Sequence, residues 1–265
     1  MKNFHQLIAE ISEYFIITAV LALPPLFVPH QTGAVLRVPS VGTLLFYALA
    51  SLFLYLRARS TQSTLSALNT AEPDAAFNQK ADAAFCRKAA SKRATSAVLS
   101  FAARLLLCFC ALTCSAVLWN LIASAAGESS LLENAAGAAA VCALLSDTPG
   151  GTFRFVSGII VLACYEEMLY RFFLPEKARM IVSLVFSDPD SARISRILYA
   201  LAELIPICLF ALAHRYLGVY AVCNALCAAV ILRTAFCKKV PIFGLCAVHA
   251  AYNAAMLIVL FNTAR

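Results

Sequence analysis

Apolar runs about as long as a bilayer is thick recur along this chain, and short polar links separate them. A helix needs about 20 mostly apolar residues to cross the hydrocarbon core of a membrane. Only 13% of the residues are charged, which is about half the fraction that is usual in soluble domains. The sequence therefore predicts an all-α fold, a polytopic transmembrane helical bundle that lies in the cell membrane as a multi-pass protein.

The number of membrane helices is predicted as seven or eight. Seven runs are long enough to cross: 11–28, 41–56, 99–126, 155–174, 194–214, 219–236 and 240–261. An eighth run, 131–145, is short and rich in alanine and glycine, so it leaves the count open. Basic residues gather in the links 57–93, 177–196 and 238–239. Seven crossings with the amino terminus inside would place all three links in the cytoplasm, where Lys and Arg are enriched.

Three parts are predicted along the chain: amino-terminal membrane helices (1–56), a basic cytoplasmic loop with an amphipathic helix (57–98), and a membrane bundle (99–265). The net charge of +7 lies mainly between the apolar runs. This position indicates orientation and contact with the lipid bilayer, and it argues against nucleic-acid binding. The eleven cysteines lie almost all inside apolar runs and form no CxxC pair, which indicates buried thiols and not a disulfide framework.

Three charged residues near the end of the run 155–174 do not belong in lipid: Glu166, Glu167 and Arg171. A charge at the centre of a bilayer costs about 2.5–3.5 kcal/mol on scales derived from membrane insertion. Glu167 and Arg171 are four residues apart, so on a helix they lie on one face and can pair. Glu166 is rotated from them by about 100° and remains available for chemistry.

Two imidazoles and an amide come from later helices. His214 ends the run 194–214, four residues after Phe210, and His249 and Asn253 are four residues apart on the last run. A glutamate, alone or with a histidine, can take a proton from a water that attacks a carbonyl. Histidine and asparagine side chains can donate hydrogen bonds to the oxyanion that forms. Together with Glu166, these residues predict a hydrolytic site.

Other interpretations stay open. A zinc-dependent membrane protease could use two histidines and a glutamate as ligands, although no HExxH helix is present. In a non-catalytic membrane protein, the charged helix could instead bind a partner or move protons. His214 could be an interfacial residue, and His249 with Asn253 could join helices by hydrogen bonds.

Taken together, the three elements resemble the CAAX prenyl protease and bacteriocin-processing (CPBP, or ABI) family of intramembrane glutamic endopeptidases. EExxxR, FxxxH and HxxxN on successive membrane helices mark that family. This chain has EEMLYR at 166–171, FALAH at 210–214 and HAAYN at 249–253. The resemblance covers about residues 155–260, the protease core that it predicts. Many members have glycine after the arginine, where this chain has Phe172.

The resemblance implies an endopeptidase that uses no metal and no cofactor and acts on a peptide or a membrane-tethered protein. By analogy, Glu166 and His214 activate the water, while His249 and Asn253 stabilise the oxyanion. Supporting roles fall to three further residues: Glu167, Arg171 and Phe210. Some members of the family act as scaffolds or in immunity to bacteriocins, which keeps the non-catalytic alternative open.

Overall fold

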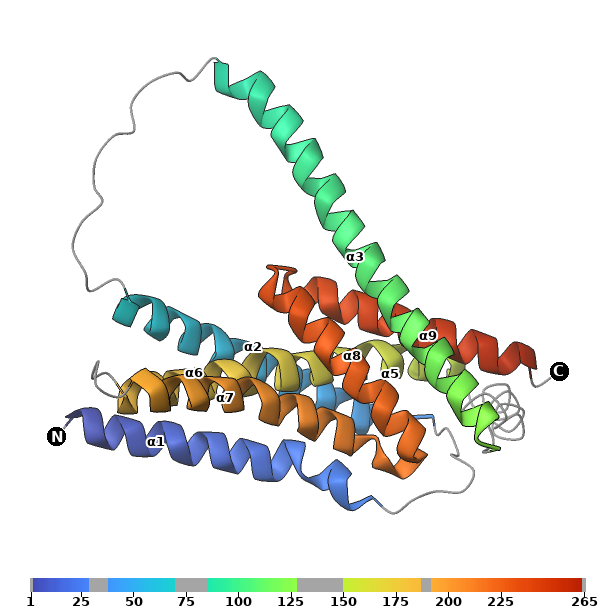
Figure 1. The fold of residues 1–265 in the computed structure, drawn as a ribbon, viewed down its shortest axis with the longest axis horizontal. Helices are drawn as coiled ribbons and strands as arrows, with labels where there is room; N and C mark the ends of the chain where they lie inside the picture. The colour runs from blue at the N-terminus through green and yellow to red at the C-terminus, as the bar shows by residue number, and fades with distance from the viewer. Residues whose placement is uncertain (1, 29–37, 70–84, 128–149, 187–191, 264–265) are drawn as a thin grey trace.

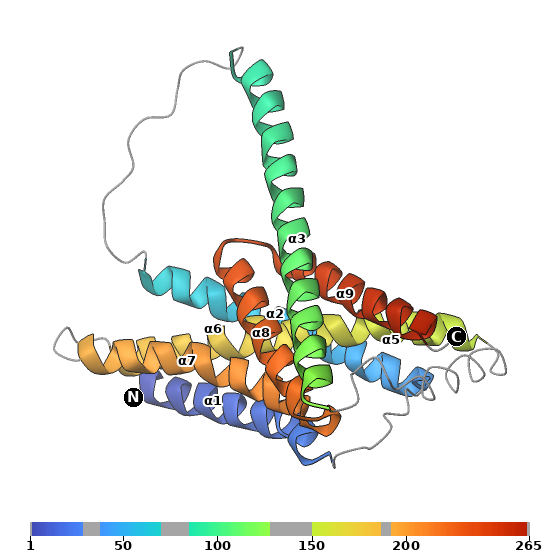
Figure 2. The same ribbon diagram turned by 45° about the vertical axis from the view of Figure 1, so that its right-hand side comes forward.

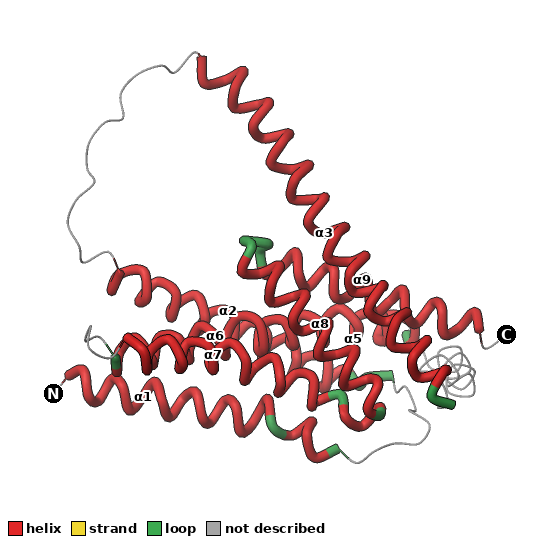
Figure 3. Tube along the Cα trace, viewed as in Figure 1, coloured by secondary structure: helices red, strands yellow, loops and turns green. Residues whose placement is uncertain are grey.

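The computed structural model describes residues 2–28, 38–69, 85–127, 150–186 and 192–263, and every regular element within them is helical (Figure 3). The helices are α1 (Lys2–Ile17), α2 (Val41–Asn69), α3 (Phe85–Ala125), α5 (Gly151–Glu166), α6 (Leu174–Val185), α7 (Ala192–Ala213), α8 (Val219–Cys237) and α9 (Ile242–Thr263). Short π and 3-10 turns follow α1 at Thr18–Ala22 and Pro24–Phe27 and join α7 to α8 at Arg215–Leu217. The predicted all-α fold is confirmed.

Within the described residues, 6 helical stretches are long and apolar enough to cross a membrane: Phe4–Ala22, Val41–Thr64, Val98–Ala125, Arg193–Leu217, Val219–Cys237 and Ile242–Val259. Each overlaps one of the predicted runs, so the prediction of a multi-pass membrane protein is confirmed. The run 155–174 is also helical, and its charged residues set it apart from the others. The short run 131–145 lies outside the described residues, and the choice between seven and eight crossings stays a prediction.

Several helices extend beyond the predicted runs. α1 begins at Lys2 and not near residue 11, α2 continues to Asn69, and α3 begins at Phe85. Part of the predicted loop 57–98 is therefore helical, while residues 70–84 are not described. The physical reason is that Lys, Arg and Glu form helices as readily as leucine does. Apolar composition marks the part of a helix in lipid and does not mark where the helix ends.

One long helix through the middle of the bundle is made of α5, a π-helical segment and α6. The π-helical segment, Glu167–Phe173, is entirely buried. Its apolar side chains, Met168, Leu169 and Phe172 among them, belong to the main hydrophobic core. The charged motif thus lies inside the protein, where other helices cover it, and not against lipid.

The other helices surround this central one. α6 contacts α1, α2 and α7, while α5 contacts α2 and α9. Figure 1 shows α1, α6 and α7 running alongside one another, with α9 above them and α8 crossing obliquely between the end of α7 and the start of α9. The second half of α3 packs on α8 and α9, and its first half projects away from the bundle in both views (Figures 1 and 2).

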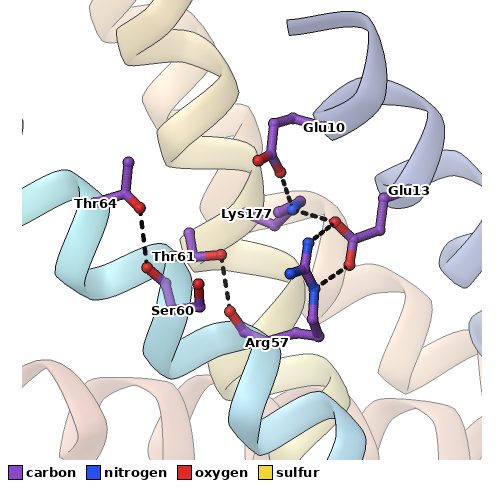
Figure 4. Close-up of polar contacts among 7 residues, drawn as sticks. All are labelled: Glu10, Glu13, Arg57, Ser60, Thr61, Thr64 and Lys177. Atoms are coloured by element: carbon purple, nitrogen blue, oxygen red, sulfur yellow. Dashed lines mark hydrogen bonds and ion pairs between the residues drawn. The ribbon is translucent and has the colours of Figure 1, made fainter. Parts of the chain in front are cut away.

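Ion pairs fasten α1 and α2 to α6 (Figure 4). Lys177 of α6 is 1% exposed at its side chain and pairs with Glu10 and Glu13 of α1. Arg57 of α2 donates two hydrogen bonds to the carboxylate of Glu13. Because a buried ammonium group is stable only when it is paired, this cluster fixes the position of α6, which directly follows the π-helical segment.

Candidate active site

The π-helical segment positions the acidic motif. Glu167 and Arg171 are 0% and 1% exposed, and 3.5 Å separates Arg171 Nε from Glu167 Oε2. The pairing predicted from their spacing is therefore present. The guanidinium of Arg171 also lies over the ring of Phe210, 3.7 Å from its centroid. A cation over an aromatic face is attracted by the ring quadrupole, which helps to stabilise this buried charge.

His249 of α9 lies between the two glutamates. Its Nδ1 is 2.8 Å from Glu167 Oε1, a hydrogen bond in which the imidazole donates to the carboxylate. Its Nε2 is 3.6 Å from Glu166 Oε2. An imidazole held in this way has a fixed ring orientation, because the partner on Nδ1 determines which way Nε2 points. Here Nε2 points toward the second carboxylate.

The two carboxylates differ in exposure. The side chain of Glu166 is 17% exposed, whereas that of Glu167 is 0% exposed and already bonded to His249. The prediction from the sequence assigned the free carboxylate to Glu166 because of its rotation away from Arg171. Of the two carboxylates, Glu166 is the one that water can reach, and its catalytic role stays a prediction.

Phe210 connects the remaining histidine to this centre. His214 Nδ1 is 2.9 Å from the Phe210 carbonyl, and the ring centroids of the two residues are 4.7 Å apart. The Phe210 ring also lies 6.2 Å from the ring of His249. The FxxxH motif therefore places one aromatic ring among Arg171, His214 and His249.

Asn253 follows His249 by one turn of α9 and is half-buried. Neither Asn253 nor His214 forms a direct hydrogen bond with Glu166 or Glu167 among the described contacts. The structure thus brings five of the predicted residues into direct contact: Glu166, Glu167, Arg171, Phe210 and His249. His214 is linked to them through Phe210, and Asn253 lies one turn after His249 on α9.

An apolar groove adjoins the π-helical segment. It has a volume of about 280 Å³ and lies where α2, α5 and α9 meet. Tyr55, Met168 and Phe243 are among the side chains that line it. Met168 directly follows the buried Glu167, so the groove runs close to the acidic motif.

The sequence analysis did not single out Arg233, which contacts the acidic motif directly. Arg233 of α8 donates from Nη1 to the main-chain carbonyl of Arg171, 2.6 Å away. It also holds Glu203 of α7 through two hydrogen bonds, of 2.5 and 2.7 Å. The available signal was Pro175, four residues after Arg171, because proline lacks the N–H that this carbonyl would accept in an α-helix.

A zinc site requires three or four converging ligands. Among the described residues, no group of three or more His, Cys, Asp or Glu side chains is arranged so that it could hold a metal ion. The geometry of Glu166, Glu167 and His249 is that of a hydrogen-bonded imidazole between two carboxylates. The zinc-dependent alternative stays a prediction from the sequence.

Comparison with known proteins assigns the family. Residues 148–255, which contain all three motifs, match the family model of the type II CAAX prenyl endopeptidase Rce1-like proteins. No curated protein and no solved structure matches the chain. The matched residues include α5, the π-helical segment, α6, α7 and α8 in full, together with most of α9. Residues 148–255 are thus a domain of the Rce1-like type II CAAX prenyl endopeptidase family, a family of hydrolases, and this implies an intramembrane protease with protein substrates.

Proposed function

We propose that this protein hydrolyses a peptide bond of a peptide or membrane-tethered protein near the cytoplasmic face of the membrane, with a water activated by Glu166 and His214. The observation that carries the proposal is the position of His249 between two carboxylates of different exposure. One carboxylate, Glu167, is committed to holding the imidazole. The other, Glu166, is left facing the reaction site.

Glu166 and His214 act on the water. The Nδ1–H of His214 donates to the Phe210 carbonyl, so that Nε2 keeps a lone pair that can accept a proton. Glu166 takes the proton of the attacking water as its oxygen bonds to the carbonyl carbon. A positioned general base of this kind contributes typically about 10²- to 10⁴-fold to the rate.

His249 and Asn253 stabilise the oxyanion. Glu167 accepts a hydrogen bond from the Nδ1–H of His249, so a hydrogen bond from Nε2 to the oxyanion requires a second proton, on Nε2. The two adjacent carboxylates provide the countercharge for such an imidazolium. The amide of Asn253 lies one turn further along the same helix face and supplies the second donor. Removal of one oxyanion donor typically costs about 10²- to 10³-fold in kcat.

The protons balance over the reaction. The water loses one proton to Glu166, and its oxygen forms the new bond to carbon. When the tetrahedral intermediate collapses, the C–N bond breaks and the proton on Glu166 passes to the leaving nitrogen. The products are a carboxylic acid and an amine, and Glu166 is again ionised. The apolar groove beside Met168 offers a surface for the part of the substrate that lies in the membrane.

The proposal is tested with the whole protein in lipid nanodiscs and a fluorogenic, farnesylated peptide that ends in a CaaX sequence. We expect Glu166→Gln to lower kcat at least about 100-fold, because it removes the general base. Glu10→Gln serves as the control, since it removes a carboxylate of α1 outside the site. A Glu166→Gln protein that cleaves at the wild-type rate would contradict the proposal.

The natural substrate is sought in the same way. Membranes that carry wild-type protein are compared with membranes that carry Glu166→Gln, and peptide termini are quantified by mass spectrometry. We expect at least one membrane-associated protein whose new terminus depends on Glu166. A scaffold is indicated by a different pair of results. In that case no peptide terminus changes, and the double variant His214→Ala, Asn253→Ala still restores the phenotype that is lost when the protein is absent.

A further inference from the structure

Pro175 creates a special position in the central helix. In an α-helix the carbonyl of Arg171 would accept a hydrogen bond from the N–H of residue 175, four positions later. That residue is proline, which has no N–H and whose ring crowds the same carbonyl. The chain is π-helical directly before this point, from Glu167 to Phe173, and Leu174 N–H bonds to Leu169 O, five residues back. The catalytic motif is therefore on a stretch of helix that lacks ordinary α-helical support.

Arg233 supplies the donor that the proline lacks. Its Nη1 is 2.6 Å from the Arg171 carbonyl oxygen, and the residue is only 4% exposed. A guanidinium that donates to a backbone carbonyl is a charge-assisted hydrogen bond, which is about twice as strong as a neutral one. The contact joins α8 to the π-helical segment at the residue that pairs with Glu167.

The guanidinium of Arg233 is itself held in place. Its Nε and Nη2 bind the two carboxylate oxygens of Glu203, a bidentate arrangement that fixes the plane of the group. Glu203 is also bound by Arg179 of α6, and Glu176 Oε1 is 3.9 Å from Arg233 Nη2. These contacts fix the position of the Arg233 guanidinium. Its hydrogen bond to the Arg171 carbonyl therefore fixes the position of the π-helical segment relative to α8.

We infer that Arg233 is a positioning residue for the protease: through the Arg171 carbonyl it sets the orientation of the π-helical segment and with it the Glu167–His249 hydrogen bond. Arg233 touches neither the substrate nor the reacting atoms. The inference rests on the proposed function, because it concerns the same site. The chain of contacts is continuous: Arg233 Nη1 to Arg171 O, Arg171 Nε to Glu167 Oε2, and Glu167 Oε1 to His249 Nδ1.

The first experiment compares Arg233→Met with the matched control Arg179→Met. Both substitutions remove an arginine that binds Glu203, but only Arg233 reaches the π-helical segment. Arg233→Met is also made together with Glu203→Gln, so that no unpaired carboxylate remains to unfold the protein. In the fluorogenic assay we expect the kcat of Arg233→Met to be about 10- to 100-fold lower than that of the wild-type protein. Its KM should stay within about twofold, as for a displaced catalytic group. Arg233→Lys, which can still donate to a carbonyl, is expected to recover part of kcat.

A spectroscopic measurement reports on the site without any substrate. The protein is labelled with ¹⁵N only in its 4 histidines and studied by solid-state NMR in lipid bilayers. The Nδ1 resonance of His249 is expected to shift in Arg233→Met and to stay unchanged in Arg179→Met. If Arg233→Met lowers only the thermal stability, with kcat and this resonance equal to those of Arg179→Met, the inference is wrong.

A double-mutant cycle with Pro175→Ala tests the reason given for the contact. Alanine restores an N–H at position 175, so the Arg171 carbonyl gains a backbone donor. The loss in kcat caused by Arg233→Met is then expected to be at least about fivefold smaller in the Pro175→Ala background. Equal losses in both backgrounds would overturn the inference. If Glu166→Gln keeps wild-type activity, the proposed function fails, and the His249 resonance still decides whether Arg233 orients the Glu167–His249 pair.

Discussion

At the scale of single residues, the site depends on how charges are kept inside an apolar bundle. Arg171 and Glu167 form an ion pair at 3.5 Å with almost no access to water, and Phe210 covers the guanidinium. The sequence predicted this pair because residues four apart lie on one helix face. It could not predict the hydrogen bond from His249 to Glu167, because its partners are 82 residues apart. Only the packing of α9 on the central helix brings them together.

The first prediction concerns the stability of this pair. Arg171→Met is expected to lower the free energy of unfolding by about 3–5 kcal/mol, because the carboxylate of Glu167 stays buried without its cation. Glu167→Gln together with Arg171→Met leaves no charge, and Gln can still accept the hydrogen bond from His249. The double variant should therefore be more stable than Arg171→Met alone. Unfolding by SDS, followed by far-UV circular dichroism, measures both; equal losses would show that charge burial is not the cause.

At the scale of helices, two prolines leave carbonyls that distant side chains then bind. Pro25 lies four residues after Leu21 and cannot donate to its carbonyl, which instead accepts a hydrogen bond from the Tyr165 hydroxyl at 3.0 Å. Pro175 stands in the same relation to Arg171. In both places the chain is π-helical just before the proline. The sequence predicted the helices from their apolar runs, but it did not predict these links, because a proline shows that a donor is missing and not which residue replaces it.

The second prediction tests the link at Leu21. Tyr165→Phe is expected to destabilise the protein by about 1 kcal/mol, the usual net worth of one hydrogen bond. In a Pro25→Ala background the effect should be smaller, since residue 25 then offers an N–H to Leu21. SDS unfolding of the four proteins measures the coupling. Additive effects would mean that the tyrosine acts through packing alone.

The third prediction concerns how α1 is attached to α6. Lys177→Met is expected to cost about 3 kcal/mol, because Glu10 and Glu13 lose a cation that is almost fully buried. Arg57→Met should cost about 1 kcal/mol or less, because its side chain is 39% exposed and water screens the pair. Limited proteolysis within α1 and SDS unfolding both rank the variants. The reverse order would show that Arg57, and not Lys177, holds α1 in place.

At the scale of the whole molecule, charge separates the lipid-facing helices from the protein-facing one. Large apolar side chains such as Phe15, Leu107 and Ile258 are exposed on the outer helices, where they suit contact with acyl chains. The central helix carries Glu166, Glu167 and Arg171 inside. The low charge fraction and the length of the apolar runs were enough to predict a membrane bundle, because a soluble domain carries about twice this fraction of charged residues. They could not fix the number of crossings, because the run 131–145 is short and rich in alanine and glycine.

The direction of the helices makes the topology testable. The two chain termini lie at opposite ends of the molecule in both views (Figures 1 and 2). In Figure 1, α3 ends and α5 begins toward the right-hand side of the molecule. With the amino terminus inside, as the basic links 57–93 and 177–196 favour, seven crossings place the carboxyl terminus outside.

The fourth prediction follows from this arrangement. Alkaline phosphatase fused after Arg265 should be active, because it folds only outside the cytoplasm, while green fluorescent protein at the same place should stay dark. A fusion within the basic link 57–93 should give the opposite result and serves as the control. A fluorescent carboxyl-terminal fusion would mean eight crossings. The link 177–196 would then lie outside, against the charge rule, and the hydrolytic site would have to be reached from the other face of the membrane.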